Sequence, residues 1–130
     1  MKTIPLLIAL GLLFASASAG AADWVFVGER KNVSYVYVDN SHIRHVSENI
    51  VSASVMYKPK RPEEIANFQC GIVDLNINCS KGQMKILHET HYFSDGTENP
   101  ILTKVNKWEY IGMDTLGEPV MHYLCKNSHL

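Results

Sequence analysis

Residues 68–79 read FQCGIVDLNINC, the most regular stretch of the chain. Its apolar and polar side chains alternate: Val73, Leu75, Ile77 and Cys79 on one side, Asp74, Asn76 and Asn78 on the other. Alternation with a period of two is typical of a β-strand with one buried face. A tight turn at Ser80–Gly82 leads into a second extended run, 84–93. The two runs predict an antiparallel hairpin with Cys79 facing inward at its closed end.

Upstream of this hairpin, three further strands are predicted, at 24–27, 33–38 and 49–57. In the second, Val36 and Val38 share a face with Ser34, and the tyrosines at 35 and 37 take the other face. In the third, the apolar face carries Val51, Ala53, Val55 and Tyr57. A polar turn is expected at 29–32, and residues 39–41 should end the second strand because their side chains bond to nearby backbone. Two prolines should interrupt the sheet at 58–62.

Downstream of the hairpin, 94–100 is expected to be a loop and 107–111 a short strand around Trp108. The period then changes to that of a helix, with apolar residues at Leu116, Val120, Met121 and Leu124. Asp114 or Thr115 should cap this helix, and Pro119 should lie in its first turn. The predicted fold class is α+β: a single antiparallel sheet of five or six strands with a C-terminal helix packed on one face.

The N-terminal segment 1–21 has the order of a secretory signal peptide. A positive start at Lys2 precedes an apolar run, 5–14, and small residues follow with two A-x-A cleavage sites at 17–21. The run is too short for a permanent membrane helix, and no cysteine near the cleavage site offers a lipid anchor. Residues 22–130 should therefore be a single exported domain, periplasmic, secreted or at the cell surface, without an integral membrane segment.

The charge of the chain argues against nucleic-acid binding. The chain has a formal net charge of −1, and removal of Lys2 with the signal takes it to about −2. Recognition of nucleic acid calls for a clustered basic surface, so no nucleic-acid partner is expected. The densest basic run, 58–61, contains a proline and is followed by Glu63 and Glu64, which favours a solvated loop.

Three cysteines, Cys70, Cys79 and Cys125, remain in the exported domain. An odd number implies one bridge and one spare thiol, or an intermolecular link, and spacing alone leaves the pairing open. Zinc is disfavoured because no cysteine has a C-x-x-C partner. The six histidines do not suggest a metal site either. His88 and His91 are three residues apart on a strand and face opposite sides, while His42 and His45 flank a surface loop, and His122 and His129 lie at the C-terminal end.

The sequence carries no catalytic motif: G-x-S-x-G, a Gly-rich phosphate loop and H-E-x-x-H are all absent. Cys70 is the only candidate nucleophile, and a buried free thiol or an intermolecular bridge explains it better. We therefore expect a protein that is not an enzyme and holds no cofactor. The remaining candidates for binding are the tyrosines, because an exposed aromatic stripe on a sheet marks a binding face. They are Tyr35, Tyr37, Tyr57, Tyr92 and Tyr110.

An ordered set of motifs resembles the surface-adhesin protein E-like domain. The predicted exported domain has DWVFVGE near its start, at 23–29, followed by YVD at 37–39 and SHIR at 41–44. Later come NINC at 76–79, MKIL at 84–87, a Tyr-x-x-x-Gly stretch at 92–96, WEYI at 108–111 and a final LGEPVMHYLC at 116–125. The resemblance extends from Asp23 to Cys125 and implies a small antiparallel sheet with a C-terminal helix, in agreement with the strand pattern.

The resemblance also implies that Cys79 and Cys125 are the family's two cysteines and form its disulfide, leaving Cys70 as the extra one. It implies a non-enzymatic binding protein, since the family's named activity is binding of host matrix and serum proteins such as vitronectin and laminin. The uncovered sheet face or an unpaired edge would meet a protein partner, and an edge also allows a homodimer. Two other hypotheses are a periplasmic accessory protein without a host partner and, third, a small-ligand or heme binder that uses the histidines.

Overall fold

The computed structural model describes residues 21–102 and 106–126. In these residues eight strands form one antiparallel sheet: β1 (Trp24–Arg30), β2 (Ser34–Asp39), β3 (Arg44–His45), β4 (Ile50–Pro59), β5 (Phe68–Asn78), β6 (Gln83–Phe93), β7 (Glu98–Ile101) and β8 (Trp108–Tyr110). One helix follows, α2 (Gly117–Cys125), and two short 3-10 turns are η1 (Asn40–His42) and η2 (Pro62–Glu64). This is the predicted α+β class, with β3 and β7 added to the strands expected. The predicted signal peptide lies, but for its last residue, outside the described residues, as does His129.

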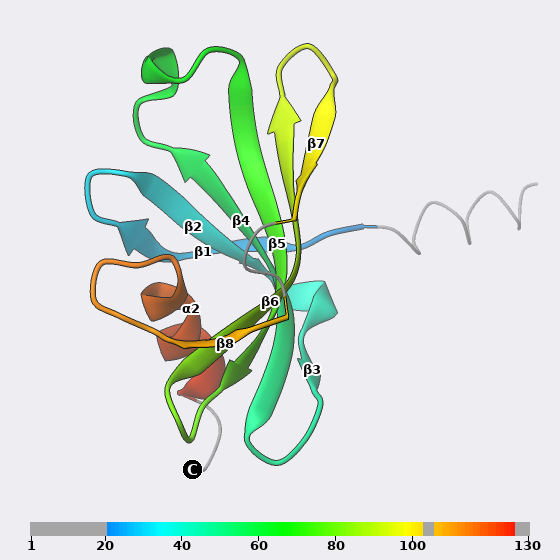
Figure 1. Ribbon diagram of the computed structural model, residues 1–130, viewed down its shortest axis with the longest axis vertical. Helices are drawn as coiled ribbons and strands as arrows, with labels where there is room; N and C mark the ends of the chain where they lie inside the picture. Colours follow the sequence, from blue (N-terminus) through cyan, green and yellow to red (C-terminus); the bar gives the residue numbers. More distant parts are fainter. Residues whose placement is uncertain (1–20, 103–105, 127–130) are drawn as a thin grey trace, which may run out of the picture.

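The sheet is built on three long central strands, and its order is β1-β2-β4-β5-β6-β7 (Figure 1). Two of the long strands carry two short partners along one edge. The first half of β4 pairs with β3 and its second half with β2. The first half of β6 pairs with β8 and its second half with β7. Each short strand therefore covers part of an edge that would otherwise be open to solvent.

The predicted hairpin is confirmed as β5 and β6, which pair from Phe68–Phe93 to Asn78–Gln83. Val73, Leu75 and Ile77 are fully buried, as their alternation predicts. The register shifts twice, between Phe68 and Cys70 and again beside Asp74 and Leu75, where a β-bulge at Leu87 inserts an extra residue into β6. The bulge changes the alternation, so that Ile86 and Glu89 lie on the same face of the sheet as Val73 and Leu75.

Helix α2 packs on β1, β2 and β4, and it covers only part of one sheet face (Figure 1). Its inward residues Val120 and Leu124 join the valines of β2 and β4 in the core. The predicted capping of this helix by Asp114 or Thr115 is wrong, since the N-cap is Leu116, without a side-chain hydrogen bond. Thr115 Oγ1 instead donates to the Gly112 carbonyl at 2.7 Å, which stabilises the turn before the helix. Pro119 lies in the first turn, as predicted.

Two expected interruptions of the sheet are absent. Residues 98–101 form strand β7 rather than loop, because Asp95 closes a tight turn by accepting hydrogen bonds from the backbone and side chain of Thr97. Strand β4 continues through Lys58 to Pro59, where the proline sits at the end of the ladder opposite Ser34. The Lys60 amide then donates to the Val33 carbonyl at 3.0 Å, so the backbone pairing outlasts the proline. Lys58 therefore belongs to the sheet and not to a solvated loop.

The disulfide implied by the family resemblance is present between Cys79 and Cys125, whose Cα atoms are 5.6 Å apart. It joins the closed end of the β5–β6 hairpin to the last residue of α2. Both cysteines pack against the core. The bridge therefore fixes α2 on the sheet from the C-terminal end of the helix.

Candidate functional site

One face of the sheet is not covered by the helix, and an aromatic cluster lies on it. The alternation of β1, β2 and β4 places Phe26 opposite Tyr37, and Tyr37 opposite Met56. Tyr35 and Lys58 form the next cross-strand pair. We refer to Phe26, Tyr35, Tyr37 and Lys58 as the aromatic face. The predicted separation of Tyr35 and Tyr37 from the core valines Val36 and Val38 is thus confirmed.

The rings of the aromatic face contact one another without being buried. Phe26 packs with its edge against Tyr37 at a centroid distance of 5.7 Å and lies 6.3 Å from Tyr35. Phe26 remains 54% exposed and Tyr35 39% exposed. Aromatic side chains that are fixed by each other yet open to solvent lose little conformational entropy when a partner covers them. This is the physical property expected of a binding face.

Lysines frame these rings. Lys58 Nζ lies 5.6 Å from the ring centroid of Tyr37, and Lys60 Nζ lies 5.4 Å from that of Tyr35. Both distances fall within the range of cation–π attraction. Lys60 is also paired with Glu29 at 2.8 Å, whereas Lys58 has no ion pair within the described ranges 21–102 and 106–126. The net character of the aromatic face is therefore apolar and cationic.

Cys70 lies next to this face and is the free cysteine of the described residues. Its position opposite Tyr92 places it on the side of the sheet away from Cys79, as the strand alternation predicts. Burial raises the pKa of the Cys70 thiol, and the charge of Lys58 offsets this only in part. A protonated, buried thiol is a poor nucleophile, so the geometry gives no support to a catalytic Cys70.

Not all the tyrosines lie on the aromatic face. Tyr57 points to the helix side of the sheet, where its ring crosses the strand β5 at Gly71. Tyr110 lies on the short edge strand β8 and is 80% exposed. Of the five tyrosines grouped from the sequence, Tyr35 and Tyr37 lie on the aromatic face, and Tyr92 lies farther along the same side. Tyr57 and Tyr110 do not belong to this face.

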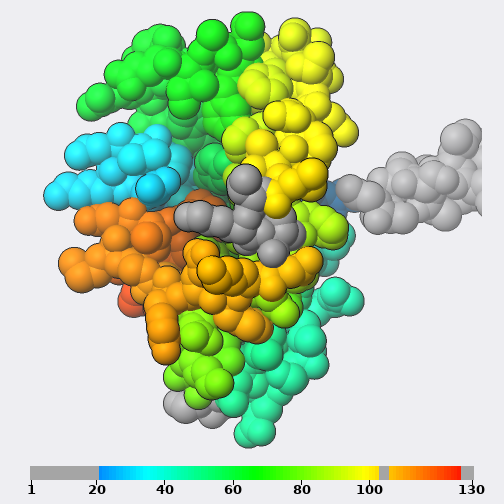
Figure 2. Space-filling view, viewed as in Figure 1, coloured from blue at the N-terminus to red at the C-terminus, as the bar shows by residue number. Residues whose placement is uncertain are grey.

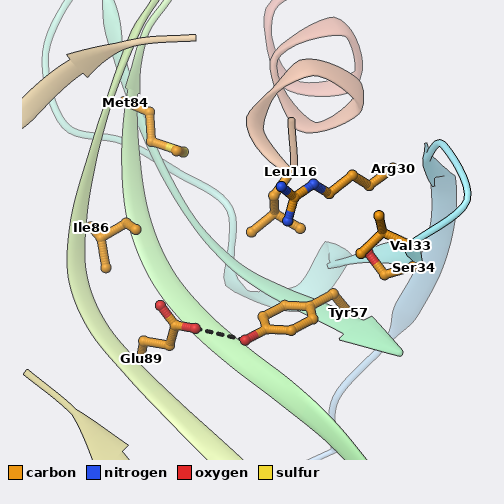
Figure 3. A pocket seen from close by; sticks show the side chains of 8 residues that line it. All are labelled: Arg30, Val33, Ser34, Tyr57, Met84, Ile86, Glu89 and Leu116. Atoms are coloured by element: carbon orange, nitrogen blue, oxygen red, sulfur yellow. Dashed lines mark hydrogen bonds between the residues drawn. The ribbon is translucent and has the colours of Figure 1, made fainter. Parts of the chain in front are cut away.

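A cavity of about 250 Å³ opens beside Tyr57 on the helix side of the sheet (Figure 3). The turn between β1 and β2, the strand β6 and the start of the helix supply its walls. Its lining is mostly apolar with one residue of each charge: Arg30, Val33, Ser34, Tyr57, Met84, Ile86, Glu89 and Leu116. Figure 2 shows the segment 106–116 lying beside the β1–β2 turn, and Arg30 Nε donates to the Asp114 carbonyl across that boundary at 3.3 Å.

Two of the lining residues, Tyr57 and Glu89, form a hydrogen-bonded group with His91. The Tyr57 hydroxyl donates to Glu89 Oε2 at 2.6 Å, and His91 Nε2 lies 2.9 Å from the same hydroxyl and 3.2 Å from that carboxylate oxygen. Because the Tyr57 hydroxyl donates its own proton to Glu89, the hydroxyl oxygen can only accept from His91. We therefore assign a proton to His91 Nε2. Burial, followed by the hydrogen bond and charge of Glu89, raises the pKa of Tyr57 well above its usual range. Tyr57 therefore remains a neutral donor.

The histidines are distributed as single residues. His88 and His91 face opposite sides of β6, as predicted, and His42 ends η1 while His45 lies in β3 opposite Val51. His122 lies in the helix. Within residues 21–102 and 106–126 no three His, Cys, Asp or Glu side chains are grouped to hold a metal ion.

Asp39, Ser41 and His42 are the residue types of a catalytic triad, but their hydrogen bonds are those of a turn. His42 Nδ1 faces both Asp39 Oδ2, at 2.7 Å, and Ser41 Oγ, at 3.0 Å. A catalytic histidine uses different ring nitrogens for the acid and the nucleophile, so this group cannot relay a proton between them. Asp39 instead accepts from the Asp23 amide and from the amide and hydroxyl of Ser41, which ties the start of β1 to the end of β2.

Of the residues that line the cavity, only Tyr57 was named from the sequence as a candidate for binding. Arg30 and Glu89 belong to no motif, and the bulge at Leu87 hides the inward position of Glu89 from any count of alternation. One signal was present. Gly71 interrupts a run of large strand residues, and a strand glycine marks a close approach of another group. A Cβ at Gly71 would overlap the ring of Tyr57.

The structure is that of a small α+β domain with an aromatic sheet face, a cavity on the helix side and a disulfide that joins its helix to its sheet. The chain belongs to the surface-adhesin protein E family, whose profile matches residues 24–126. Membership of this family identifies an adhesin-like protein and implies an exported or surface location.

Among solved structures, Haemophilus influenzae protein E resembles this chain. It superposes with a TM-score of 0.55 at 18% sequence identity, over 79% of this chain and 85% of that one. At this identity the likeness shows the common fold alone. A comparison with curated protein sequences finds no significant match. No helix of the described residues is long and apolar enough to cross a membrane.

Proposed function

We propose that the chain is an exported, non-enzymatic adhesin-like protein that binds a protein partner of the host matrix or of the cell envelope through its aromatic face. The observation that carries the proposal is the exposed, mutually packed pair of Phe26 and Tyr35 on the sheet side that the helix leaves open. Membership of the surface-adhesin family supports the same function. Export would follow removal of the predicted signal peptide, 1–21.

The chemistry of the aromatic face suits a protein partner. Tyrosine and other aromatic residues are enriched at protein interfaces, where a few of them supply most of the binding energy. Lys58 adds a cation that its neighbours leave without an ion pair in the described part of the chain, so a partner surface with acidic groups would complement it. A homodimer through the open edge of β1 is a further proposal and does not require this face.

The test is binding of the purified exported protein to immobilised laminin and vitronectin, and to envelope proteins from the producing cell. The double variant Phe26→Ala/Tyr35→Ala should bind its partner at least tenfold more weakly, since each exposed aromatic anchor is worth more than about 1 kcal/mol. Tyr110→Ala is the control, because it removes an exposed aromatic ring from β8, outside the aromatic face. Equal affinity of the double variant and the wild type, with unchanged circular dichroism, would contradict the proposal.

Cell fractionation distinguishes the two settings. Protein at the surface or in the medium that binds matrix proteins supports a host-directed adhesin. Protein confined to the periplasm that binds only envelope components supports the accessory role. Protein that binds neither leaves the aromatic face without a function and overturns the proposal.

A further inference from the structure

The cavity beside Tyr57 faces away from the aromatic face. Its floor is the sheet surface formed by Met84 and Ile86 of β6, and Leu116 lies across the cavity from them, just before the helix begins (Figure 3). Tyr57 closes one end with a ring whose hydroxyl is already bonded. The interior is therefore apolar over most of its surface, as ligand pockets usually are.

Two opposite charges face this apolar cavity without contacting each other. Arg30 reaches in from the end of β1, and Glu89 reaches in from β6 (Figure 3). Apart from the bond from Nε to the Asp114 carbonyl, the Arg30 guanidinium has no hydrogen bond or ion pair within residues 21–102 and 106–126. Its remaining N–H groups are therefore available to an anion.

Glu89 is available in the same partial way. Its Oε2 atom accepts from Tyr57 and lies against His91, which fixes the orientation of the carboxylate. Its Oε1 atom has no hydrogen bond in the part of the chain that the structure describes. The side chain is 19% exposed, so a donor placed in the cavity would meet a carboxylate that water reaches only partly.

We propose that this cavity is a binding site for a small apolar zwitterion of dipeptide size, with its carboxylate on Arg30 and its ammonium on Glu89. Charge complementarity selects the class, because a ligand with one charge would satisfy one wall and leave the other unpaired. The volume of about 250 Å³ lies just below the range of drug-sized pockets and suits a molecule of this size. Apolar side chains of the ligand would lie on Met84, Ile86 and Leu116.

The experiment is a titration of the purified protein, labelled with ¹³C at its methionine methyl groups, with leucyl-leucine. Met84 lines the cavity and should shift and saturate. Met56 lies on the opposite side of the sheet, so its signal should stay in place. Leucyl-leucine amide and N-acetyl-leucyl-leucine each lack one charge and should bind at least tenfold more weakly, a loss of about 1.4 kcal/mol or more.

Two charge variants assign the contacts. Arg30→Gln should lose the preference for the free acid over the amide, and Glu89→Gln should lose the preference for the free amine over the acetylated form. Lys31→Gln and Glu98→Gln are matched controls, because they remove the same charges from exposed positions that do not line the cavity. Both controls should keep wild-type preferences.

An unmoved Met84 signal at saturating leucyl-leucine overturns the inference, as does equal binding of all three compounds. A shift of Met56 instead of Met84 would place the ligand on the other side of the sheet, which also overturns it. None of these results bears on the binding of matrix or envelope proteins by the aromatic face. Failure of the zwitterion site is therefore distinguishable from failure of the proposed function.

Discussion

At the scale of single residues, Asp39 is the polar side chain with the most hydrogen-bond contacts in the part of the chain that the structure describes. It is 3% exposed and accepts from two backbone amides and the Ser41 hydroxyl, besides facing His42. Burial raises the pKa of the Asp39 carboxyl, and these hydrogen bonds outweigh burial and lower it to about 2. The Y-V-D sequence at 37–39 thus has a structural role: its aspartate ties the end of β2 to the start of β1.

Asp39 should therefore make stability depend on pH in the acid range. A folded-state pKa below the unfolded value stabilises the fold above the unfolded pKa, and this contribution is lost as the pH falls through the folded pKa. As the pH falls from 3.8 to about 2, this stabilisation should disappear. It amounts to roughly 2 kcal/mol at neutral pH. Urea unfolding should show this difference in stability between the wild type and Asp39→Asn at neutral pH, and the difference should be lost near pH 2. A difference independent of pH would contradict the lowered pKa of Asp39.

Gly71 is the second residue with a testable role. It permits the Tyr57 ring to cross β5 and reach Glu89, since a Cβ there would overlap the ring. Gly71→Ala should lower the free energy of unfolding by roughly 1–3 kcal/mol, as overpacking does. Gly112→Ala is the control, because its Cβ would meet only Thr115 Cγ2 at 3.6 Å, an ordinary contact. Adding Tyr57→Ala to Gly71→Ala should cost less than the sum of both, and additive effects would refute the contact.

At the scale of elements, α2 has few residues with which to hold its place. Its nine residues begin without a side-chain cap and bury only Gly117, Val120 and Leu124. A helix this short is not stable alone in water, so packing and the disulfide must supply its stability. The helix thus depends on the sheet more than the sheet depends on the helix.

Leu124→Ala should therefore destabilise the protein by about 2–5 kcal/mol, the usual cost of truncating a buried leucine. His122→Ala, on the exposed side of the same helix, should change the free energy of unfolding by less than about 0.5 kcal/mol. Denaturant unfolding followed by circular dichroism measures both. Similar effects of the two substitutions would show that α2 does not pack as described.

At the scale of the whole molecule, the Cys79–Cys125 bridge closes a loop with a sequence separation of 46 residues. Such a loop restricts the unfolded chain by roughly 4 kcal/mol in the chain-entropy model. Replacing both cysteines by serine should lower stability by about this amount, and Cys70→Ala, which leaves the bridge intact, is the control.

A thiol count checks the pairing independently. The denatured, unreduced protein should show one reactive thiol per chain, that of Cys70, because the other two cysteines are bridged. In the folded protein this thiol should react slowly, since Cys70 is buried and its pKa is raised. No reactive thiol in the denatured protein would indicate that Cys70 is itself bridged to another chain.

The sequence alone determined six of the eight described strands, the β5–β6 hairpin, the helix and the faces of the alternating residues in β2, β4 and β5, because alternation and helical spacing are local properties of the chain. It did not reveal β3, β7 or the continuation of β4 through Pro59, since each depends on hydrogen bonds from a neighbouring segment, and it placed the helix cap wrongly. The disulfide was implied by the family resemblance and not by cysteine spacing.

The two candidate surfaces depended on the tertiary structure to different degrees. Tyr35 and Tyr37 could be assigned to an outward face from their strand, but only cross-strand register placed Phe26 and Lys58 beside them. The cavity could not be foreseen, because Arg30 and Glu89 are 59 residues apart in the chain and the β-bulge at Leu87 turns Glu89 inward. The strand pattern follows from residues that are neighbours in the sequence, whereas only the folded sheet brings Arg30 and Glu89 to the same cavity.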